Sequence, residues 1–191
     1  MHYLSYTLTR LVSNFIPLKE QEIRIFQYCF EQVLNKLLYS IIFLGIGWFT
    51  HRLLLTVVFL FAFTMLRRFG GGAHASNPII CFILSYEIGL LFIFGLPMVY
   101  LFLPEMIYIL IIILSSIPIL LLSPMDSKNK RIKGALRRKL QLRSRILILF
   151  LLLVFFVLFV CRLKLYYGAI TFCVMICSVN ILIGLIQNKR K

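Results

Sequence analysis

His74 and Cys81 are the two residues of this chain whose types and spacing are best suited to chemistry. They lie in the segment RRFGGGAHASNPIIC, residues 67–81, between two long apolar stretches. A cysteine thiolate is a nucleophile, and an imidazole that titrates near neutral pH can remove the thiol proton. A straight helix would place the two residues about 10.5 Å apart along its axis. The pair can therefore cooperate only if the chain folds back between them.

The residues between His74 and Cys81, and those just before them, predict such a break. Gly70–Gly72 allow backbone angles that other residues avoid, while Pro78 disfavours helix at Asn77 and suits the first turn of the next helix. We expect Asn77 to cap that helix and Cys81 to lie in its first turn. Unpaired backbone N–H groups and the helix dipole stabilise a thiolate there, so Cys81 should ionise more readily than a thiol buried in lipid.

A purely structural interpretation of the same segment stays open. The glycines could make only a tight turn, with His74 solvated and Cys81 facing lipid. A metal site built on these two residues would lack further ligands, and no cofactor is expected. His2 and His51 have no thiol, glycine or carboxylate neighbourhood of comparable kind.

The composition of the chain indicates a membrane protein. Its 191 residues are 61% hydrophobic and 14% charged, and the mean hydropathy is +0.97. A soluble domain of this length could not bury so much apolar surface. The net charge of +15 comes from basic residues between apolar runs, a pattern unlike that of nucleic-acid-binding modules. Residues 1–17 lack the features of a cleaved secretory signal, so we expect the N-terminus to be retained.

Six apolar runs predict an all-α polytopic protein forming one integral membrane domain over residues 1–191. Amphipathic stretches over residues 1–36 precede the first run. The runs lie at 37–50, 53–66, 79–103, 106–123, 146–161 and 168–187. About 20 residues are needed to cross a bilayer. The first two runs are short, so they predict either a hairpin of tilted helices or segments that do not fully cross.

The distribution of basic residues predicts the topology. With the N-terminus inside, 18 of the 21 lysines and arginines are cytoplasmic, and only Arg52, Arg162 and Lys164 lie outside. Both termini, a candidate catalytic loop at 67–78 and a basic loop at 124–145 should then be cytoplasmic.

The cysteines predict no disulfide framework and match no zinc pattern. Cys173 and Cys177 are four residues apart and should share a helix face as small apolar residues at a packing surface. Cys29 and Cys161 have the same interpretation.

Two motifs resemble the accessory gene regulator B (AgrB) family of membrane cysteine endopeptidases from Gram-positive bacteria. In the first segment the matching residues are Arg67, Gly71, Gly72, His74, Ala75 and Cys81. In the basic segment, Pro124, Asp126 and Asn129 resemble the family's Pro-x-Asp-x-x-Asn element. The length and hydropathy agree over essentially the whole chain.

The resemblance implies that His74 is a general base and Cys81 a nucleophile in the maturation of a quorum-sensing signal. The partner would be an AgrD-like precursor with an amphipathic N-terminal helix, a central cysteine or serine and an acidic C-terminal tail. The enzyme would remove the tail and promote closure of a thiolactone or lactone ring in the cell membrane. A homodimer is compatible with the short exposed segments of the chain.

Several further residues are candidates for supporting roles. Arg67 and Arg68 could steady an oxyanion or a substrate carboxylate. Asp126 and Asn129 could orient His74 or make an ordinary turn, and we favour the turn. Glu87 is unusual in a membrane segment and is either structural or substrate-facing.

The basic segment could also attract the acidic tail of the precursor. The residues assigned to substrate binding are Asp126, Asn129, Lys130, Arg131, Arg137 and Arg138. Two other classes of function remain, a peptide transporter or exporter and a non-catalytic membrane scaffold.

Overall fold

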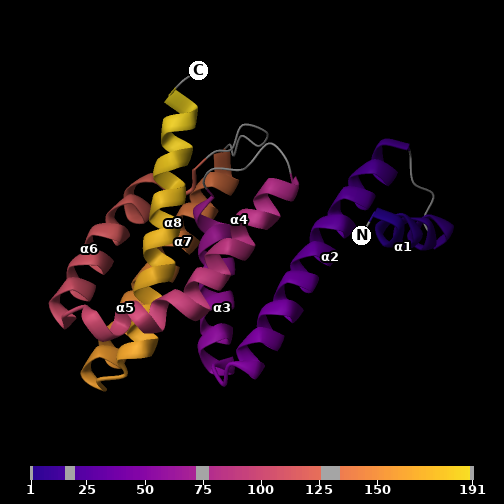
Figure 1. Cartoon of the computed structure of the whole chain (residues 1–191). Coiled ribbons are helices and arrows are strands. Elements are labelled where there is room, and N and C mark those ends of the chain that lie inside the picture. The colour runs from indigo at the N-terminus through magenta and orange to yellow at the C-terminus, as the bar shows by residue number, and fades with distance from the viewer. Residues whose placement is uncertain (1, 16–19, 72–77, 126–133, 190–191) are drawn as a thin grey trace.

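A computed structural model describes residues 2–15, 20–71, 78–125 and 134–189 (Figure 1). All regular elements in this part of the chain are helical. In chain order they are α1 (His2–Phe15), α2 (Glu20–Phe49), α3 (Leu53–Gly70), α4 (Pro78–Leu90), the π-helical turn η1 (Leu91–Gly95), α5 (Leu96–Phe102), α6 (Glu105–Leu122), α7 (Gly134–Val160) and α8 (Lys164–Lys189).

The helices confirm the predicted all-α membrane architecture. Five of them, α2, α3, α6, α7 and α8, are long and apolar enough to cross a bilayer. The third predicted run, 79–103, is the continuous stretch α4–η1–α5. The first two apolar runs are shorter than the helices that contain them, since α2 has 30 residues and α3 has 18.

Two helices extend well beyond the apolar runs that predicted them. The amphipathic stretch that begins at Glu20 and the first apolar run form one helix, α2. The segment assigned to a basic loop at 124–145 is helical from Gly134 onward, because α7 includes its last 12 residues. Lysine, arginine, leucine and glutamine are good helix formers, so this segment continues the helix into its basic part.

The helix α8 lies at the centre of the bundle, against α3, α6, α7 and α5 (Figure 1). Its packing face repeats every three or four residues, as helical geometry requires. Cys173 and Cys177 are buried on this face, which confirms their predicted packing role, whereas Cys29 and Cys161 are exposed and that prediction is wrong for them. The buried side chains of α8 include Tyr167, Ile170, Cys173, Val174, Cys177 and Ile181.

The first two helices lie at one side of the bundle (Figure 1). Helix α2 contacts α4 where the Phe43 ring lies over Gly89, and a Cβ at residue 89 would collide with that ring. Helix α1 packs on α2 and buries Ser5 and Thr9, while Leu11 is exposed. The helix predicted near the N-terminus is present, and it turns Ser5 and Thr9 inward and leaves Leu11 exposed.

Candidate functional site

The segment that carries His74 and Cys81 begins and ends as the glycines and Pro78 predict. Helix α3 ends at Gly70, Gly71 has a φ of 69°, and α4 begins at Pro78. Cys81 lies in the first turn of α4, although the direction of its side chain is outside what the structure describes. His74, Gly72 and Asn77 also lie outside the described residues. The helix therefore breaks at the predicted place.

The chain after α6 returns to the end of α3 and pairs with it. The Met125 N–H donates a 2.9 Å hydrogen bond to the Gly70 carbonyl, and Gly71 and Met125 form an isolated β-bridge. A Cβ at residue 71 would collide with the Met125 carbonyl oxygen. Gly71 thus meets two separate requirements for glycine, a positive φ and a close approach of two backbones.

Two buried serines extend this contact to α7. The Ser123 hydroxyl lies 3.5 Å from the Phe69 carbonyl oxygen and 3.4 Å from that of Gly70, and donates to them. The Ser144 hydroxyl donates a 2.7 Å hydrogen bond to Ser123 Oγ. We call Ser123, Ser144 and the Gly70 carbonyl the serine latch. It fixes the end of α3 to the end of α6 and to the third turn of α7.

This latch defines one end of the bundle, which we call the loop end. The sequence left open whether the segments 67–81 and 124–145 meet, and the structure shows that Gly70 and Gly71 of the first contact Met125 of the second. We call residues 67–78 the glycine segment. Asp126 directly follows Met125, which pairs with Gly71 of this segment. The side chains of Asp126, Asn129, Lys130 and Arg131 lie outside the described residues, whereas Arg137 and Arg138 are exposed on the first turns of α7.

Arg67 joins the glycine segment to the helix that carries Cys81. Its Nη1 lies 3.3 Å from Ser85 Oγ on α4, and its guanidinium lies 5.8 Å from the centre of the Phe63 ring. The Tyr39 hydroxyl of α2 donates a 3.0 Å hydrogen bond to the Ser85 carbonyl. Ser85 therefore links α2, α3 and α4.

The register of α4 relates this contact to Cys81. Residues four apart in a helix share a face and are separated by about 6 Å along the axis. Ser85 is four residues after Cys81, so the Arg67 guanidinium binds α4 about one turn from the position of Cys81. Glu87, two residues further on, is exposed, and it has a different helical phase.

Sequence reasoning missed four residues that organise this region, namely Tyr39, Ser85, Ser123 and Ser144. The spacing of four between Cys81 and Ser85 was a usable signal, as was the position of Ser123 directly before the Pro124 motif. Tyr39 and Ser144 gave none, because their partners are remote in sequence. Within the described ranges no group of three or more histidine, cysteine or acidic side chains could hold a metal ion.

These features define a polytopic helical membrane protein with two segments latched together at one end of the bundle. The chain matches the family described as Accessory gene regulator B over residues 5–181, and it belongs to that family. No curated protein and no solved structure matches the chain. Family membership associates the protein with the membrane, with a peptide precursor and with processing of the accessory gene regulator autoinducer.

Proposed function

We propose that this protein is a membrane cysteine endopeptidase that cleaves the C-terminal tail from an AgrD-like precursor and promotes its cyclisation to a thiolactone or lactone autoinducer. Cys81 is the nucleophile and His74 the general base. The observation that most supports this proposal is the placement of Cys81 in the first turn of α4, after a break whose other end is held by the serine latch. A nucleophile on a rigid helix start and a base on a short tethered segment can be kept within reach of each other.

The reaction can be written without an external energy source. The Cys81 thiolate attacks the carbonyl at the junction between the central segment and the tail, while His74 takes the thiol proton and passes it to the leaving amine. The C–N bond breaks and a thioester to Cys81 forms. A thiol or hydroxyl of the precursor then attacks this thioester, and its proton passes through His74 to the departing Cys81 sulfur, so the ring closes and the Cys81 thiol is restored.

Arg67 supplies a positive charge near the reacting atoms. Its contact with Ser85 holds the guanidinium about one helical turn from Cys81, about 6 Å along the axis. A cation at this range favours the thiolate and the oxyanion that forms when the carbonyl is attacked. Arg67 is partly buried, so water screens this charge less than it would screen an exposed one.

We assign the loop end to the cytoplasmic face of a Gram-positive cell membrane, together with both termini. The basic residues around the loop end support this topology, since they are retained on the cytoplasmic side. An amphipathic precursor helix would then reach the site along the membrane interface, and its acidic tail would meet Arg137 and Arg138.

The test is co-expression of the full chain with its precursor and mass spectrometry of the released tail. His74→Ala and Cys81→Ala should each abolish release while membrane abundance stays unchanged. The matched controls are His51→Ala for the histidine and Cys161→Ser for the thiol, since both residues are exposed and lie in the α2–α3 and α7–α8 turns, at the opposite end of the bundle from the loop end (Figure 1). These controls should retain release.

Release of the tail by Cys81→Ala or His74→Ala would contradict the proposal. A transporter would be favoured if the wild type exports the precursor without cleaving it and Cys81→Ser exports it at the same level. Tolerance of both His74 and Cys81 substitutions in every assay would favour a scaffold.

A further inference from the structure

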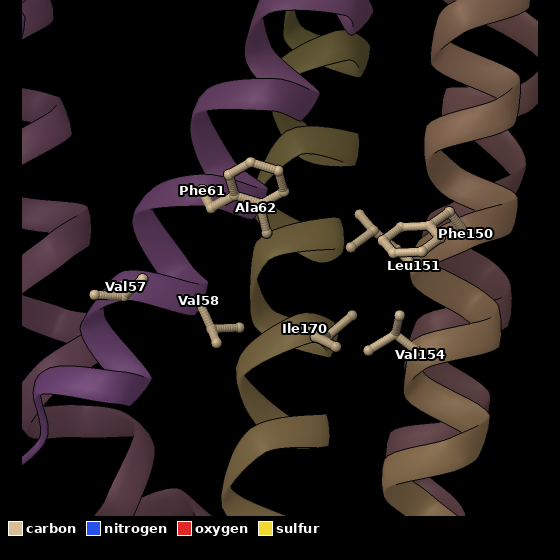
Figure 2. Close-up of a pocket in the computed structure, with 8 residues that line it drawn as sticks. All are labelled: Val57, Val58, Phe61, Ala62, Phe150, Leu151, Val154 and Ile170. Atoms are coloured by element: carbon tan, nitrogen blue, oxygen red, sulfur yellow. The ribbon is translucent and has the colours of Figure 1, made fainter.

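An apolar groove runs between α3 and α7 on the outside of the bundle, with α8 as its floor (Figure 2). Its volume is about 300 Å³. Ala62, Leu151 and Ile170 are buried at its base, while Val57 and Phe150 are exposed at its walls. Every residue that lines it is apolar: Val57, Val58, Phe61, Ala62, Phe150, Leu151, Val154 and Ile170.

Two arginines, one from α3 and one from α7, lie near the same aromatic ring at the loop end. The Arg68 guanidinium of α3 is 5.9 Å from the centre of the Phe69 ring, and the Arg143 guanidinium of α7 is 6.0 Å from the same centre. Both side chains are exposed, and among the described residues neither has a carboxylate partner. We call Arg68 and Arg143 the arginine pair.

Helical register places the arginine pair above the groove. Arg68 is seven residues after Phe61 in α3, and Arg143 is seven residues before Phe150 in the antiparallel α7. Seven residues are close to two turns, so each arginine shares the face of its groove residue about 10 Å further along the helix. Each wall of the groove therefore has an arginine on the same helix face, nearer the loop end.

We propose that the groove and the arginine pair bind one anionic phospholipid. The phosphate contacts Arg68 and Arg143, and one acyl chain occupies the groove. Guanidinium groups form strong, charge-assisted hydrogen bonds with phosphate oxygens. The distance of about 10 Å along the helices between the arginine pair and the groove matches a phospholipid whose headgroup lies at the interface and whose acyl chain lies in the hydrocarbon region of one leaflet.

The chemistry of the groove favours an acyl chain over a peptide. An extended peptide would leave its backbone N–H and C=O groups without partners against eight apolar side chains. An acyl chain has no polar groups to satisfy. This site uses none of His74, Cys81 and Arg67, and it does not depend on the proposed peptidase function.

The first arm of the test concerns the headgroup. The purified full chain in non-ionic detergent is titrated with phosphatidylglycerol or with phosphatidylcholine of the same acyl composition, and bound lipid is counted by native mass spectrometry. We expect one phosphatidylglycerol to bind more tightly than phosphatidylcholine. Each arginine near an anionic lipid contributes about fivefold, so the double variant Arg68→Gln/Arg143→Gln should weaken binding about 25-fold.

The matched control removes the same charge elsewhere. Arg10→Gln/Arg24→Gln changes two exposed arginines of α1 and α2 and should leave the affinity for phosphatidylglycerol within about twofold. Equal weakening by the two double variants would show a general attraction of charges and would overturn the proposal.

The second arm concerns the acyl chain. Val154→Trp fills the groove from α7 and should weaken binding of phosphatidylglycerol, whereas Val157→Trp, at an exposed position of α7 outside the groove, should not. Glycerol phosphate, which carries the headgroup chemistry without acyl chains, should fail to compete. Competition by glycerol phosphate, or wild-type binding by Val154→Trp, would remove the acyl-chain assignment and contradict the proposal.

Discussion

Ser144 donates a 2.7 Å hydrogen bond to Ser123 Oγ, and this bond joins α7 to the residue that holds the end of α3. Both side chains are buried, so the bond is shielded from water. It is one of the contacts that fix the start of α7 relative to Gly70 and Gly71. A displacement of α7 would therefore act on the end of α3.

Substitution of Ser144 by alanine should lower the free energy of unfolding by about 1 kcal/mol and reduce precursor cleavage. The stability change is small because one neutral hydrogen bond is lost, but cleavage depends on the geometry that the latch maintains. The measurements are unfolding in detergent and tail release. The control is Ser116→Ala, whose hydroxyl donates a hydrogen bond to the Ile112 carbonyl of its own helix. Equal loss of cleavage in both variants would contradict a positioning role for the latch.

Gly71→Ala should abolish cleavage while the protein still inserts into the membrane. A Cβ at residue 71 collides with the Met125 carbonyl oxygen, so the two segments must separate. Gly134→Ala is a close control, because Gly134 also has a positive φ, 58°, but nothing lies within 4 Å of its added Cβ. A positive φ strains alanine in both variants, and more so at Gly71, whose ψ of −142° lies near a region that essentially only glycine adopts. Cleavage should therefore survive in Gly134→Ala, and its loss in both would assign the effect to strain alone.

The helix break was predictable because its causes are local. Gly70–Gly72 and Pro78 determine backbone angles through their own chemistry, and the structure breaks there. The pairing of Gly71 with Met125 was not predictable, since the helices α4, η1, α5 and α6 separate the two residues. Hydropathy also could not reveal that α7 begins at Gly134, because charged residues end an apolar run without ending a helix.

Arg67→Ala should lower the kcat of precursor cleavage more than it changes KM. The guanidinium acts on charges that grow during attack, and such interactions lower the barrier rather than strengthen binding. Ser85→Ala should have a smaller effect in the same direction, because it removes the 3.3 Å contact that positions Arg67 but leaves the charge. Arg67→Lys should restore part of the activity. A change in KM alone would assign Arg67 to substrate binding.

Charge reversal at Arg137 and Arg138 should raise the KM for a precursor with an acidic tail. Both residues are exposed on α7, so their contribution is long-range attraction that salt screens. The wild-type rate at low precursor concentration should fall as salt is added, and that dependence should be weaker in Arg137→Glu/Arg138→Glu. A precursor whose tail acids are replaced by amides is the control. Unchanged cleavage and salt dependence would show that these residues do not attract the tail.

At the opposite end of the bundle, Arg52 stabilises an irregular turn. Its Nη1 donates a 2.6 Å hydrogen bond to the Ile93 carbonyl, inside the π-helical turn Leu91–Gly95. Pro97 is four residues after Ile93 and has no N–H, so it cannot donate the α-helical hydrogen bond to that carbonyl. A charged donor from the α2–α3 turn therefore replaces a missing backbone donor.

Arg52→Ala should destabilise the protein by about 1.5–3 kcal/mol, the range for a hydrogen bond to a charged group. Pro97→Ala restores a backbone N–H, so the Ile93 carbonyl should depend less on Arg52 in that background. The double-mutant cycle, measured by unfolding in detergent, should show a coupling energy of at least about 0.5 kcal/mol, with Arg52→Ala less damaging when residue 97 is alanine. Arg162→Ala, at an exposed arginine of the α7–α8 turn, is the control and should show no coupling with Pro97→Ala. Additive effects of Arg52→Ala and Pro97→Ala would show that the arginine does not act by replacing the donor that proline lacks.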